Sequence, residues 1–386
     1  MIIIGQSGTR LRAFEKQNLE KYFGEVIIVD CSQVLQTYNQ NPKAQYVYWR
    51  PDTERTNKNQ FQQYCLQECA LASRGVKFIN SMFGFPKTQS KERAFIEWEK
   101  NGIPHPKWFE WENQEIFFKK LYSKENENIF YETSLDRTKI AHFPFLLRLN
   151  NSVTGYETVL VEPVQSRITK VMELILTSAT TKEDMRKYLD KIEKAHKNPK
   201  YGGGIDCKKL AVSFIETRNK SGYRYSFRII VAADKIVAGY ARMTKGNDWC
   251  AITKKWTLDM AEDWIQANKQ CQEFCTVHYE DIINAVKCLG SNFLGVDVII
   301  RQDGKHYFLE VQSGFSVGYL NHPDWSPPFY NPCQPKELVD YLIENMDMLK
   351  KRIPFYCMWL NKDRVFDTAF KAIKESFDKQ DKRLNQ

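Results

Sequence analysis

The chain has 386 residues, of which 42% are hydrophobic, so it can bury a sizeable core divided into two or three domains. Lys and Arg number 56 against 47 Asp and Glu, and the formal net charge of +9 favours an anionic ligand or partner. No apolar run approaches the roughly 18 residues that span a bilayer, and residues 1–5 are too short for the apolar core of a signal peptide. We therefore expect a cytoplasmic protein without a membrane partner.

Residues 1–85 alternate between short apolar runs and helical patterns, which predicts a small open α/β domain. Strands are expected at residues 1–4, 25–29 and 76–79, and helices at 9–22 and 57–73. Gly5-Gln6-Ser7-Gly8 follows the first strand and is a weak candidate for a phosphate cradle. A plain strand-to-helix turn is the better interpretation, because the third glycine of a dinucleotide fingerprint is absent.

The pattern changes near Phe85-Pro86, and a second segment, residues 86–205, begins there. Ser90 is the expected cap of a helix that ends at Asn101-Gly102. Strands at 145–149 and 158–162 are joined by the polar loop 150–156, which is of a kind that folds over a phosphate tail. Residues 163–205 are predicted to be a mostly helical insertion, with Thr181 and Asp184 as a capping box.

The third and fourth segments are residues 206–331 and 332–386. Strands are expected at 210–215, 225–231 and 235–240, followed by a helical region at 257–288. Residues 335–350 and 363–380 are amphipathic and rich in lysine. Their apolar stripe is interrupted, which favours packing on the protein over membrane binding.

A hairpin closes the third segment and places two carboxylates side by side. Residues 296–301 and 305–311 flank Asp303-Gly304, a dipeptide favoured in two-residue hairpin turns. With that turn Arg301 faces His306, Ile299 faces Phe308 and Asp297 faces Glu310, while Gln312 emerges on the face of Glu310. The opposite face is the expected core face and carries Val296, Val298, Ile300, Tyr307, Leu309 and Val311.

Directly opposed carboxylates destabilise a sheet, so Asp297 and Glu310 require a compensating cation unless the turn is assigned wrongly. A metal ion is one interpretation. Salt bridges from Arg301 or from a neighbouring lysine are the alternative.

Ten cysteines are scattered along the chain, which favours reduced thiols. Cys65 and Cys69 are four residues apart, as are Cys271 and Cys275, and His278 follows the second pair. A zinc site is conceivable there, but this spacing describes one helix face and no second ligand pair has the usual spacing. We expect buried or half-buried thiols.

The order of these features resembles the ATP-grasp superfamily, especially its carboxylate-amine ligases of the D-alanyl-D-alanine ligase and ribosomal-protein glutamate ligase types. The resemblance covers residues 78–320. Lys91 stands before Gly102-Ile103-Pro104-His105-Pro106 as a nucleotide-binding lysine does in the family. Arg148 replaces a second such lysine, ahead of a small-residue loop that includes Ser152, Thr154 and Gly155.

Three further features follow in the order that the family has. Val212-Ser213-Phe214-Ile215-Glu216 is similar to the strand that borders the adenine, which implies nucleotide contacts by Phe214, Ile215 and Glu216. Arg228 and Arg242 match two arginines near the phosphates, although Arg224 shares a strand face with Arg228 and is an equal candidate. Asp297, Glu310 and Gln312 match the magnesium ligands, with glutamine in place of the usual asparagine. Gly246-Asn247-Asp248-Trp249-Cys250 stands where a glycine-rich loop is often found.

The resemblance implies an ATP-grasp fold of mixed α/β and α+β class. Residues 1–85 would be the N-terminal α/β (pre-ATP-grasp) domain, 86–205 the first lobe with its helical insertion, 206–331 the second lobe with the metal site, and 332–386 a helical C-terminal extension. ATP and Mg²⁺ are the implied cofactors.

The implied activity is that of an ATP-dependent carboxylate-amine ligase that forms an acyl phosphate and then an amide, with Arg228 and Arg242 in catalytic roles. Its substrates would be a small-molecule or peptide carboxylate and an amine, whose identities the motifs do not specify. A non-catalytic nucleotide-binding or partner-binding protein with this fold is one alternative, and an ATP-dependent phosphotransferase is another. Nucleic-acid binding is not expected, because aromatic and basic residues do not interleave in a recognisable motif.

Overall fold

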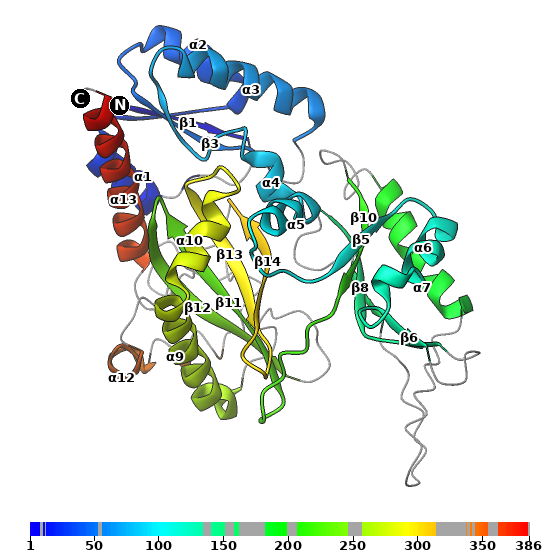
Figure 1. The fold of residues 1–386 in the computed structure, drawn as a ribbon. Coiled ribbons are helices and arrows are strands. Elements are labelled where there is room, and N and C mark those ends of the chain that lie inside the picture. The colour runs from blue at the N-terminus through cyan, green and yellow to red at the C-terminus, as the bar shows by residue number, and fades with distance from the viewer. Residues whose placement is uncertain are drawn as a thin grey trace. The chain divides into compact units, whose positions relative to one another are not determined.

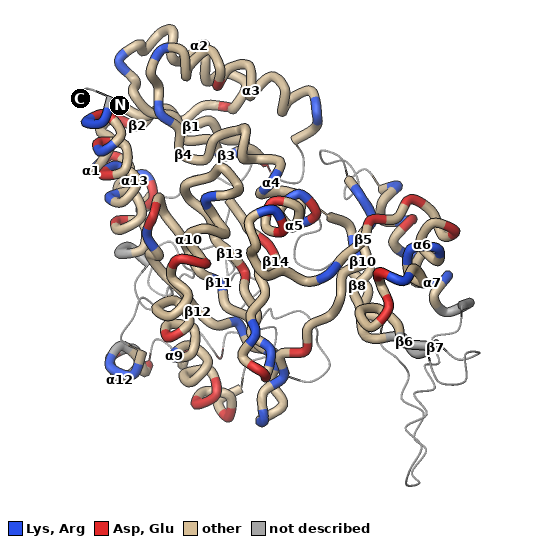
Figure 2. Tube along the Cα trace, viewed as in Figure 1, with Lys and Arg blue, Asp and Glu red and all other residues tan. Residues whose placement is uncertain are grey.

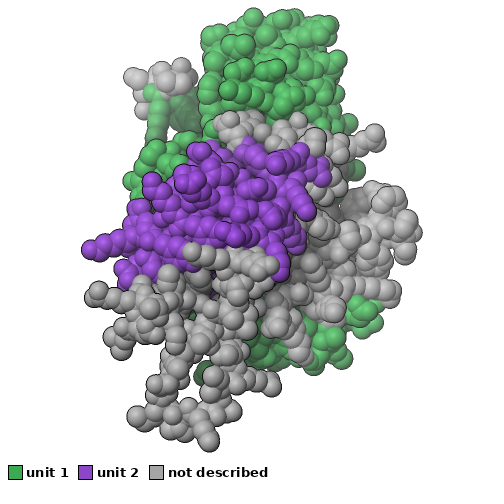
Figure 3. Space-filling view, turned by 90° about the vertical axis from the view of Figure 1, so that its right-hand side faces the viewer, with its two compact units in different colours: residues 1–105, 217–386 green, residues 106–216 purple. Residues whose placement is uncertain are grey.

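The structure is a computed structural model that describes residues 1–7, 11, 13–52, 56–133, 140–150, 158–161, 182–198, 207–245, 257–313, 337, 340–341, 344–353 and 362–384. The chain divides into two compact units, which Figure 3 distinguishes by colour: residues 1–105 with 217–386, and residues 106–216. Each unit has its own sheets and is described separately. The four segments expected from the sequence stay predictions.

A parallel sheet opens the first unit (Figure 1). Its strands run in the order β2-β1-β3-β4, where β1 is Ile2–Gln6, β2 Val26–Val29, β3 Tyr46–Arg50 and β4 Lys77–Ile79. The connecting helices are α1 (Ala13–Phe23), η1 (Cys31–Gln33) with α2 (Val34–Gln40), and α3 (Lys58–Ala72). The expected small open α/β arrangement is confirmed, with β3 as an additional strand that the sequence analysis did not predict.

Gly5 lies in β1, where its neighbours leave no room for a side chain. A Cβ atom on Gly5 would lie 2.6 Å from Val34 Cγ2 and 3.0 Å from Trp49 Cε3, so close packing requires glycine there. The hydroxyl of Ser7 accepts a hydrogen bond of 3.0 Å from the backbone N–H of Asp52. Gly8 and the two residues that follow it lie outside the described residues, so the interpretation as a plain turn stays a prediction.

The second sheet of this unit is antiparallel and runs in the order β12-β11-β13-β14. Its strands are β11 (Tyr223–Ala232), β12 (Lys235–Lys245), β13 (Phe293–Ile300) and β14 (His306–Gln312). Helices η3 (Leu258–Met260), α9 (Ala261–Val277) and α10 (Tyr279–Lys287) follow β12 in the chain, and α9 and α10 pack against the sheet. This architecture buries one sheet face under helices, as an α+β fold does.

Near the C-terminus the unit has α12 (Met346–Arg352) and α13 (Lys362–Leu384), and α13 contacts α1, β11 and β12. The ring centroids of Phe366 and Phe14 are 5.3 Å apart, and those of Phe370 and Phe293 are 5.6 Å apart. The helix thus joins the parallel sheet's layer to the antiparallel sheet (Figure 1). Aromatic burial of this size accounts for packing on the protein.

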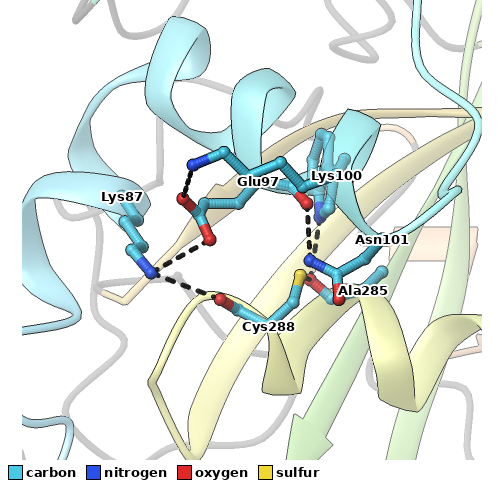
Figure 4. Close-up of polar contacts among 7 residues, drawn as sticks. Lys87, Glu97, Lys100, Asn101, Ala285 and Cys288 are labelled. Carbon is cyan, nitrogen blue, oxygen red and sulfur yellow. Dashed lines mark hydrogen bonds and ion pairs between the residues drawn. The ribbon is translucent and has the colours of Figure 1, made fainter.

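Helices α4 (Phe85–Gln89) and α5 (Lys91–Lys100) are anchored beside the end of α10. Figure 4 shows Lys87 between the carboxylate of Glu97, at 3.2 Å, and the carbonyl oxygen of Cys288, at 3.5 Å. The indole Nε1 of Trp98 donates to the carbonyl oxygen of Ala285 at 2.8 Å. These contacts fix the first residue of α5, Lys91, relative to the antiparallel sheet.

The second unit contains an antiparallel sheet in the order β5-β10-β8-β9. The described helices and strands of this unit are β5 (Trp108–Trp111), α6 (Gln114–Leu121), η2 (Lys124–Asn126), β6 (Tyr131–Thr133), β7 (Ile140–His142), β8 (Phe145–Leu149), β9 (Thr158–Val161), α7 (Lys182–Lys197) and β10 (Lys209–Ser213). Met185, Leu189 and Ile192 of α7 recur at helical spacing and are buried in the core of this unit. Thr181 of the expected capping box lies outside the described residues.

The fold class is therefore mixed: the described residues form one parallel and two antiparallel four-stranded sheets, a two-stranded sheet of β6 and β7, and helices packed on the larger sheets. The expectation of an α/β and α+β protein is confirmed. Within the described ranges, no helix combines the length and apolar character that crossing a membrane requires.

Candidate functional site

The hairpin between β13 and β14 has a three-residue loop, Gln302-Asp303-Gly304, so the expected two-residue turn is wrong. The backbone N–H of Arg301 donates to the carbonyl oxygen of Lys305 at 2.8 Å, and that of Gly304 donates to the carbonyl oxygen of Arg301 at 2.9 Å. Gly304 has a φ of +84°, in the left-handed region that glycine adopts most readily. A turn followed by a left-handed glycine is the common three-residue hairpin connection.

A β-bulge beside Asp297 then restores part of the expected register. Ile300 pairs with His306 and Ile299 with Tyr307, but Asp297 pairs with Glu310 because the bulge between Asp297 and Val298 shifts the register by one residue. The expected pairing of Asp297 with Glu310 is confirmed, since the extra loop residue and the bulge cancel. The expected pairings of Ile299 with Phe308 and of Arg301 with His306 are wrong for the same reason.

The core face changes accordingly. Phe308 pairs with Val298 and is fully buried, whereas Tyr307 and Leu309 are only half-buried. The bulge thus puts Phe308 in the core in place of Tyr307 and Leu309, while Val311 is buried as expected.

Two arginines satisfy the carboxylate of Asp297, which is 2% exposed. Arg228 faces Asp297 across β11 and β13, and its Nε and Nη2 donate to Oδ1 and Oδ2 at 2.7 and 2.8 Å. Arg242 of β12 lies with its Nη2 2.7 Å from Oδ2 of the same carboxylate. A bidentate guanidinium pair of this kind fixes orientation as well as charge.

Glu310 is paired with a different cation. The ammonium of Lys91 lies 3.0 Å from Oε2 of Glu310, and the side-chain amide of Gln312 donates to Oε1 at 3.1 Å. Lys91 is buried in α5, and α5 packs against β14. The structure therefore brings together six of the residues that the sequence analysis selected: Lys91, Arg228, Arg242, Asp297, Glu310 and Gln312.

This cluster carries more positive than negative charge. Three cationic side chains contact two carboxylates, so the five side chains together carry a formal net charge of +1. Burial opposes the charge of Arg228, but Asp297 and then Tyr240 outweigh burial and raise the pKa of Arg228 above its usual range. Burial raises the pKa of Tyr240 in turn, so its hydroxyl stays protonated beside the arginines. Figure 2 shows basic and acidic positions along the strands of the antiparallel sheet of the first unit.

Two buried polar atoms beside the cluster have no hydrogen-bond partner among the described residues: Oγ of Ser226 and Nε of Arg242. Ser226 pairs with Arg242 across β11 and β12, so the two atoms belong to adjacent positions of the sheet. Unpaired buried donors cost free energy until a ligand or water accepts from them. An anion with several oxygens meets that requirement and also matches the excess positive charge.

Ser226 was not selected as a site residue from the sequence. The signal was the period of two along residues 224–228, which places Ser226 on the face of Arg224 and Arg228. That alternation shows which face of the strand Ser226 occupies. It does not show whether the hydroxyl of Ser226 binds a ligand or has a structural role.

The donor set does not fit a bound magnesium ion in this arrangement. Both oxygens of Asp297 accept hydrogen bonds from arginines, and the amide of Gln312 offers its N–H to Glu310. A dication would raise an already positive, buried cluster to a formal charge of +3. The metal role of Asp297, Glu310 and Gln312 stays a prediction that the observed hydrogen bonds do not favour.

The remaining selected residues belong to the second unit or lie outside the described part of the chain. Arg148 is on β8, on the face opposite the core residues Leu147 and Leu149. Phe214, Ile215 and Glu216 follow β10, and the backbone N–H of Phe214 donates to the carbonyl oxygen of Pro144 at 3.1 Å. Ser152, Thr154, Gly155 and the segment 246–250 lie outside the described residues.

The described cysteines form no disulfide, as expected for reduced thiols, but Cys69 is exposed rather than buried or half-buried. Cys271 and Cys275 are buried on α9, and each sulfur is 3.2 Å from the place that a Cβ on Gly239 would take. The pair therefore packs against β12 rather than forming a metal site with His278.

No family model matches the sequence, and no curated protein matches it. Among solved structures, the chain is similar to D-alanine–D-alanine ligase from Bacillus anthracis, at 10% identity and a TM-score of 0.45, covering 98% of this chain and 99% of that one. It is also similar to N5-carboxyaminoimidazole synthetase from Staphylococcus aureus complexed with ADP, at 10% identity and a TM-score of 0.47, covering 80% and 69%. Biotin carboxylase from Campylobacter jejuni matches at 11% identity and a TM-score of 0.46, covering 92% and 70%.

These three proteins are ATP-grasp enzymes, the family that the sequence resembles. Each TM-score is below 0.5, and no fold, reaction or substrate is drawn from the likeness.

Proposed function

We propose that this chain is an ATP-dependent ligase that activates a carboxylate as an acyl phosphate and joins it to an amine. The proposal rests on the cluster of charged side chains on the antiparallel sheet of the first unit. There Lys91, Arg228 and Arg242 outnumber the carboxylates of Asp297 and Glu310, beside the unpartnered donors of Ser226 and Arg242. A chain of phosphate groups is the anion that best matches these cations and hydrogen-bond donors, because arginines bind phosphate oxygens bidentately.

The same cluster has the chemistry that phosphoryl transfer demands. Charge spreads over the equatorial oxygens of the transferring group, and fixed donors in a partly buried place stabilise it by position. Arg228 is held rigidly by Asp297, so little reorganisation is needed when charge develops. The Nε of Arg242 is a further donor that remains available while its Nη2 stays on Asp297.

The proposed reaction has two steps. A carboxylate oxygen of the acid attacks the γ-phosphorus of ATP, the bond to the β,γ-bridging oxygen breaks, and ADP leaves with that electron pair. The amine nitrogen then attacks the acyl carbon, inorganic phosphate leaves, and the nitrogen releases its proton to solvent. The choice of an acid and an amine as substrates rests on the order of sequence features similar to the carboxylate-amine ligases. Arg148, Phe214, Ile215 and Glu216 are proposed nucleotide contacts on the same basis.

A non-catalytic nucleotide-binding protein is the second candidate, and one observation favours it. The oxygens of Asp297, which the family resemblance assigns to a metal, are bonded to Arg228 and Arg242 instead. Carboxylates that pair with the protein's own cations in this way would not hold a metal ion, and a site without the metal ion would fit phosphate binding without transfer.

ADP release separates the two candidates. The purified chain is incubated with ATP and Mg²⁺ against pools of amino acids and peptides, and ADP is measured with a coupled assay. The ligase releases ADP only when both an acid and an amine are present, with one phosphate and one amide formed per ADP. Saturable ATP binding with no ADP release from any pool would support the non-catalytic candidate, and ADP release with acid alone would support a phosphotransferase.

A further inference from the structure

A second polar cluster lies on the first unit, where the chain passes from α9 to α10. His278 sits between the two helices, Asp281 is in the first turn of α10, and His306 is the first residue of β14. Nδ1 of His278 is 3.1 Å from Oδ2 of Asp281, and Nε2 of His306 is 4.0 Å from the same oxygen. One nitrogen or oxygen from each residue thus falls within 4.8 Å of the other two.

His306 has a buried nitrogen that the described part of the chain leaves unused. Its Nε2 is buried and accepts or donates no hydrogen bond among the described residues. The ring is enclosed by aromatic neighbours, with centroids 5.1 Å from Phe274, 5.7 Å from Phe308 and 4.3 Å from His278. A buried imidazole nitrogen without a partner costs free energy, which points to a ligand absent from the described contacts.

We propose that His278, Asp281 and His306 bind a divalent transition-metal ion of the zinc class. Two imidazoles and one carboxylate are a recurrent three-ligand set for such ions, and the fourth position stays open to water. The half-exposed carboxylate of Asp281 leaves solvent access to that position. This site is separate from the cluster of Lys91, Arg228, Arg242, Asp297 and Glu310, and it does not depend on the proposed ligase function.

Metal binding requires the three ligand atoms, which lie within 4.8 Å of one another, to move closer together. Ligands at about 2.0 to 2.1 Å from a tetrahedral ion are about 3.4 Å from one another. The 3.1 Å between His278 and Asp281 is already near that spacing, and the 4.0 Å between His306 and Asp281 must shorten by about 0.6 Å. Side-chain rotation of Asp281, which lies on the exposed side of the cluster, supplies such a movement.

The environment also favours the ligating form of the imidazole. Burial, followed by the nearby His278, lowers the pKa of His306 against the opposing effect of Asp281, which favours the neutral ring. Neutral imidazole is the metal ligand.

A bound ion would join β14 to the α9–α10 junction. Glu310 lies four residues after His306 on the same strand, and Gln312 lies two residues further. The ion would therefore stiffen the strand that supplies the pairing partner of Lys91, and we expect a structural contribution to stability.

Metal binding by the chain itself tests the site. The protein is treated with a chelator, dialysed, and titrated with Zn²⁺ by calorimetry, and its thermal midpoint is recorded with and without the ion. We expect one ion per chain and a higher midpoint with Zn²⁺, because a ligand that binds only the native state stabilises it. Co²⁺ in place of Zn²⁺ should show visible bands of nitrogen and oxygen ligation without the near-ultraviolet absorption of a thiolate.

The variants separate loss of a ligand from loss of the fold. Asp281→Asn changes an exposed side chain and should weaken Zn²⁺ binding at least tenfold with an unchanged metal-free melting curve. His306→Gln should do the same, whereas Cys271→Ser and His196→Gln serve as controls that keep the affinity. Unchanged binding in Asp281→Asn and His306→Gln, absence of binding by the unmodified chain, or a thiolate spectrum with Co²⁺ would each overturn the proposal.

Discussion

Arg228 and Asp297 face each other on neighbouring strands and are joined by two parallel hydrogen bonds of 2.7 and 2.8 Å. The pair is almost completely buried, and Arg242 adds a third contact to the same carboxylate. Arginine here supplies the cation that the opposed carboxylates require. The repulsion between Asp297 and Glu310 is relieved by the protein itself, because Lys91 compensates the second carboxylate.

Asp297→Asn tests whether this carboxylate balances the arginines. The change leaves Arg228 buried against a neutral amide, and we expect the free energy of unfolding to fall by roughly 3 kcal/mol. The excess charge of the cluster rises by one, so ATP should bind more tightly in the presence of a chelator. Urea unfolding and calorimetric titration measure the two effects. Weaker ATP binding with unchanged stability would instead identify Asp297 as a direct ligand of the nucleotide or its metal.

The sequence predicts best those elements whose pattern is local. The strand expected at residues 145–149 coincides with β8, whose residues alternate between buried and half-buried positions. The helix expected at 57–73 differs from α3 by one residue at each end. The strand β3, Tyr46–Arg50, was missed because it is buried along nearly its whole length and shows no alternation of apolar and polar residues.

The register of the hairpin shows what local rules leave undetermined. Asp303-Gly304 occurs in both two-residue and three-residue connections, and no residue type marks the bulge that follows Asp297. The extra loop residue and the bulge each shift the register by one residue, and the two shifts cancel at Asp297 and Glu310. The pairing of Asp297 with Arg228 depends on the adjacency of β11 and β13, which are separated in sequence by β12, α9 and α10. Chain order does not specify that adjacency.

If Glu310 holds the metal ion that the family resemblance implies, Glu310→Gln should abolish the acid-dependent and amine-dependent release of ADP while the fold stays intact. Removal of one of two opposed carboxylates relieves repulsion, but it also removes the partner of Lys91 at 3.0 Å. We therefore expect a small loss of stability of about 1 kcal/mol. Circular dichroism and urea unfolding check the fold, and a cycle with Lys91→Met isolates the pair. Full ADP release by Glu310→Gln would remove Glu310 from the proposed chemistry.

Arg148→Ala should weaken ATP binding at least tenfold, or about 1.4 kcal/mol, if Arg148 contacts a nucleotide phosphate. The expectation rests on the position of Arg148 on β8, on the face opposite the core residues Leu147 and Leu149. Arg148→Lys restores the residue that the family usually has, and a gain of affinity would show that the guanidinium is a compromise. Calorimetric titration of both variants decides between these results, and equal affinity in Arg148→Ala would exclude the residue from the site.

Gly304→Ala should destabilise the hairpin by roughly 1 kcal/mol, because alanine adopts a φ of +84° only with strain. No atom lies within 4 Å of the position that the new Cβ would take, so steric contact adds nothing to that cost. Gly102 has a φ of +69° and equally open surroundings, and Gly102→Ala is a matched control outside the hairpin. Both should lower the thermal midpoint, but only Gly304→Ala should also weaken the activity that depends on Glu310. An unchanged midpoint in Gly304→Ala would contradict the three-residue loop.

Asp367→Asn tests the contact between α13 and α1. Hydrogen bonds from Lys21, at 2.7 Å, and from Tyr22, at 2.6 Å, hold the pKa of Asp367 below its usual range. A carboxyl whose pKa is lowered by folding contributes stability that is present above its unfolded pKa and is lost as the pH falls through the folded value. At pH 7 we therefore expect Asp367→Asn to lower the free energy of unfolding by up to about 1 kcal/mol, since the contact is partly exposed. The difference from the unmodified chain should shrink below about pH 4, where free aspartate protonates. Urea unfolding at a series of pH values measures this, and a loss of equal size at pH 7 and pH 3 would assign the effect to packing rather than to charge.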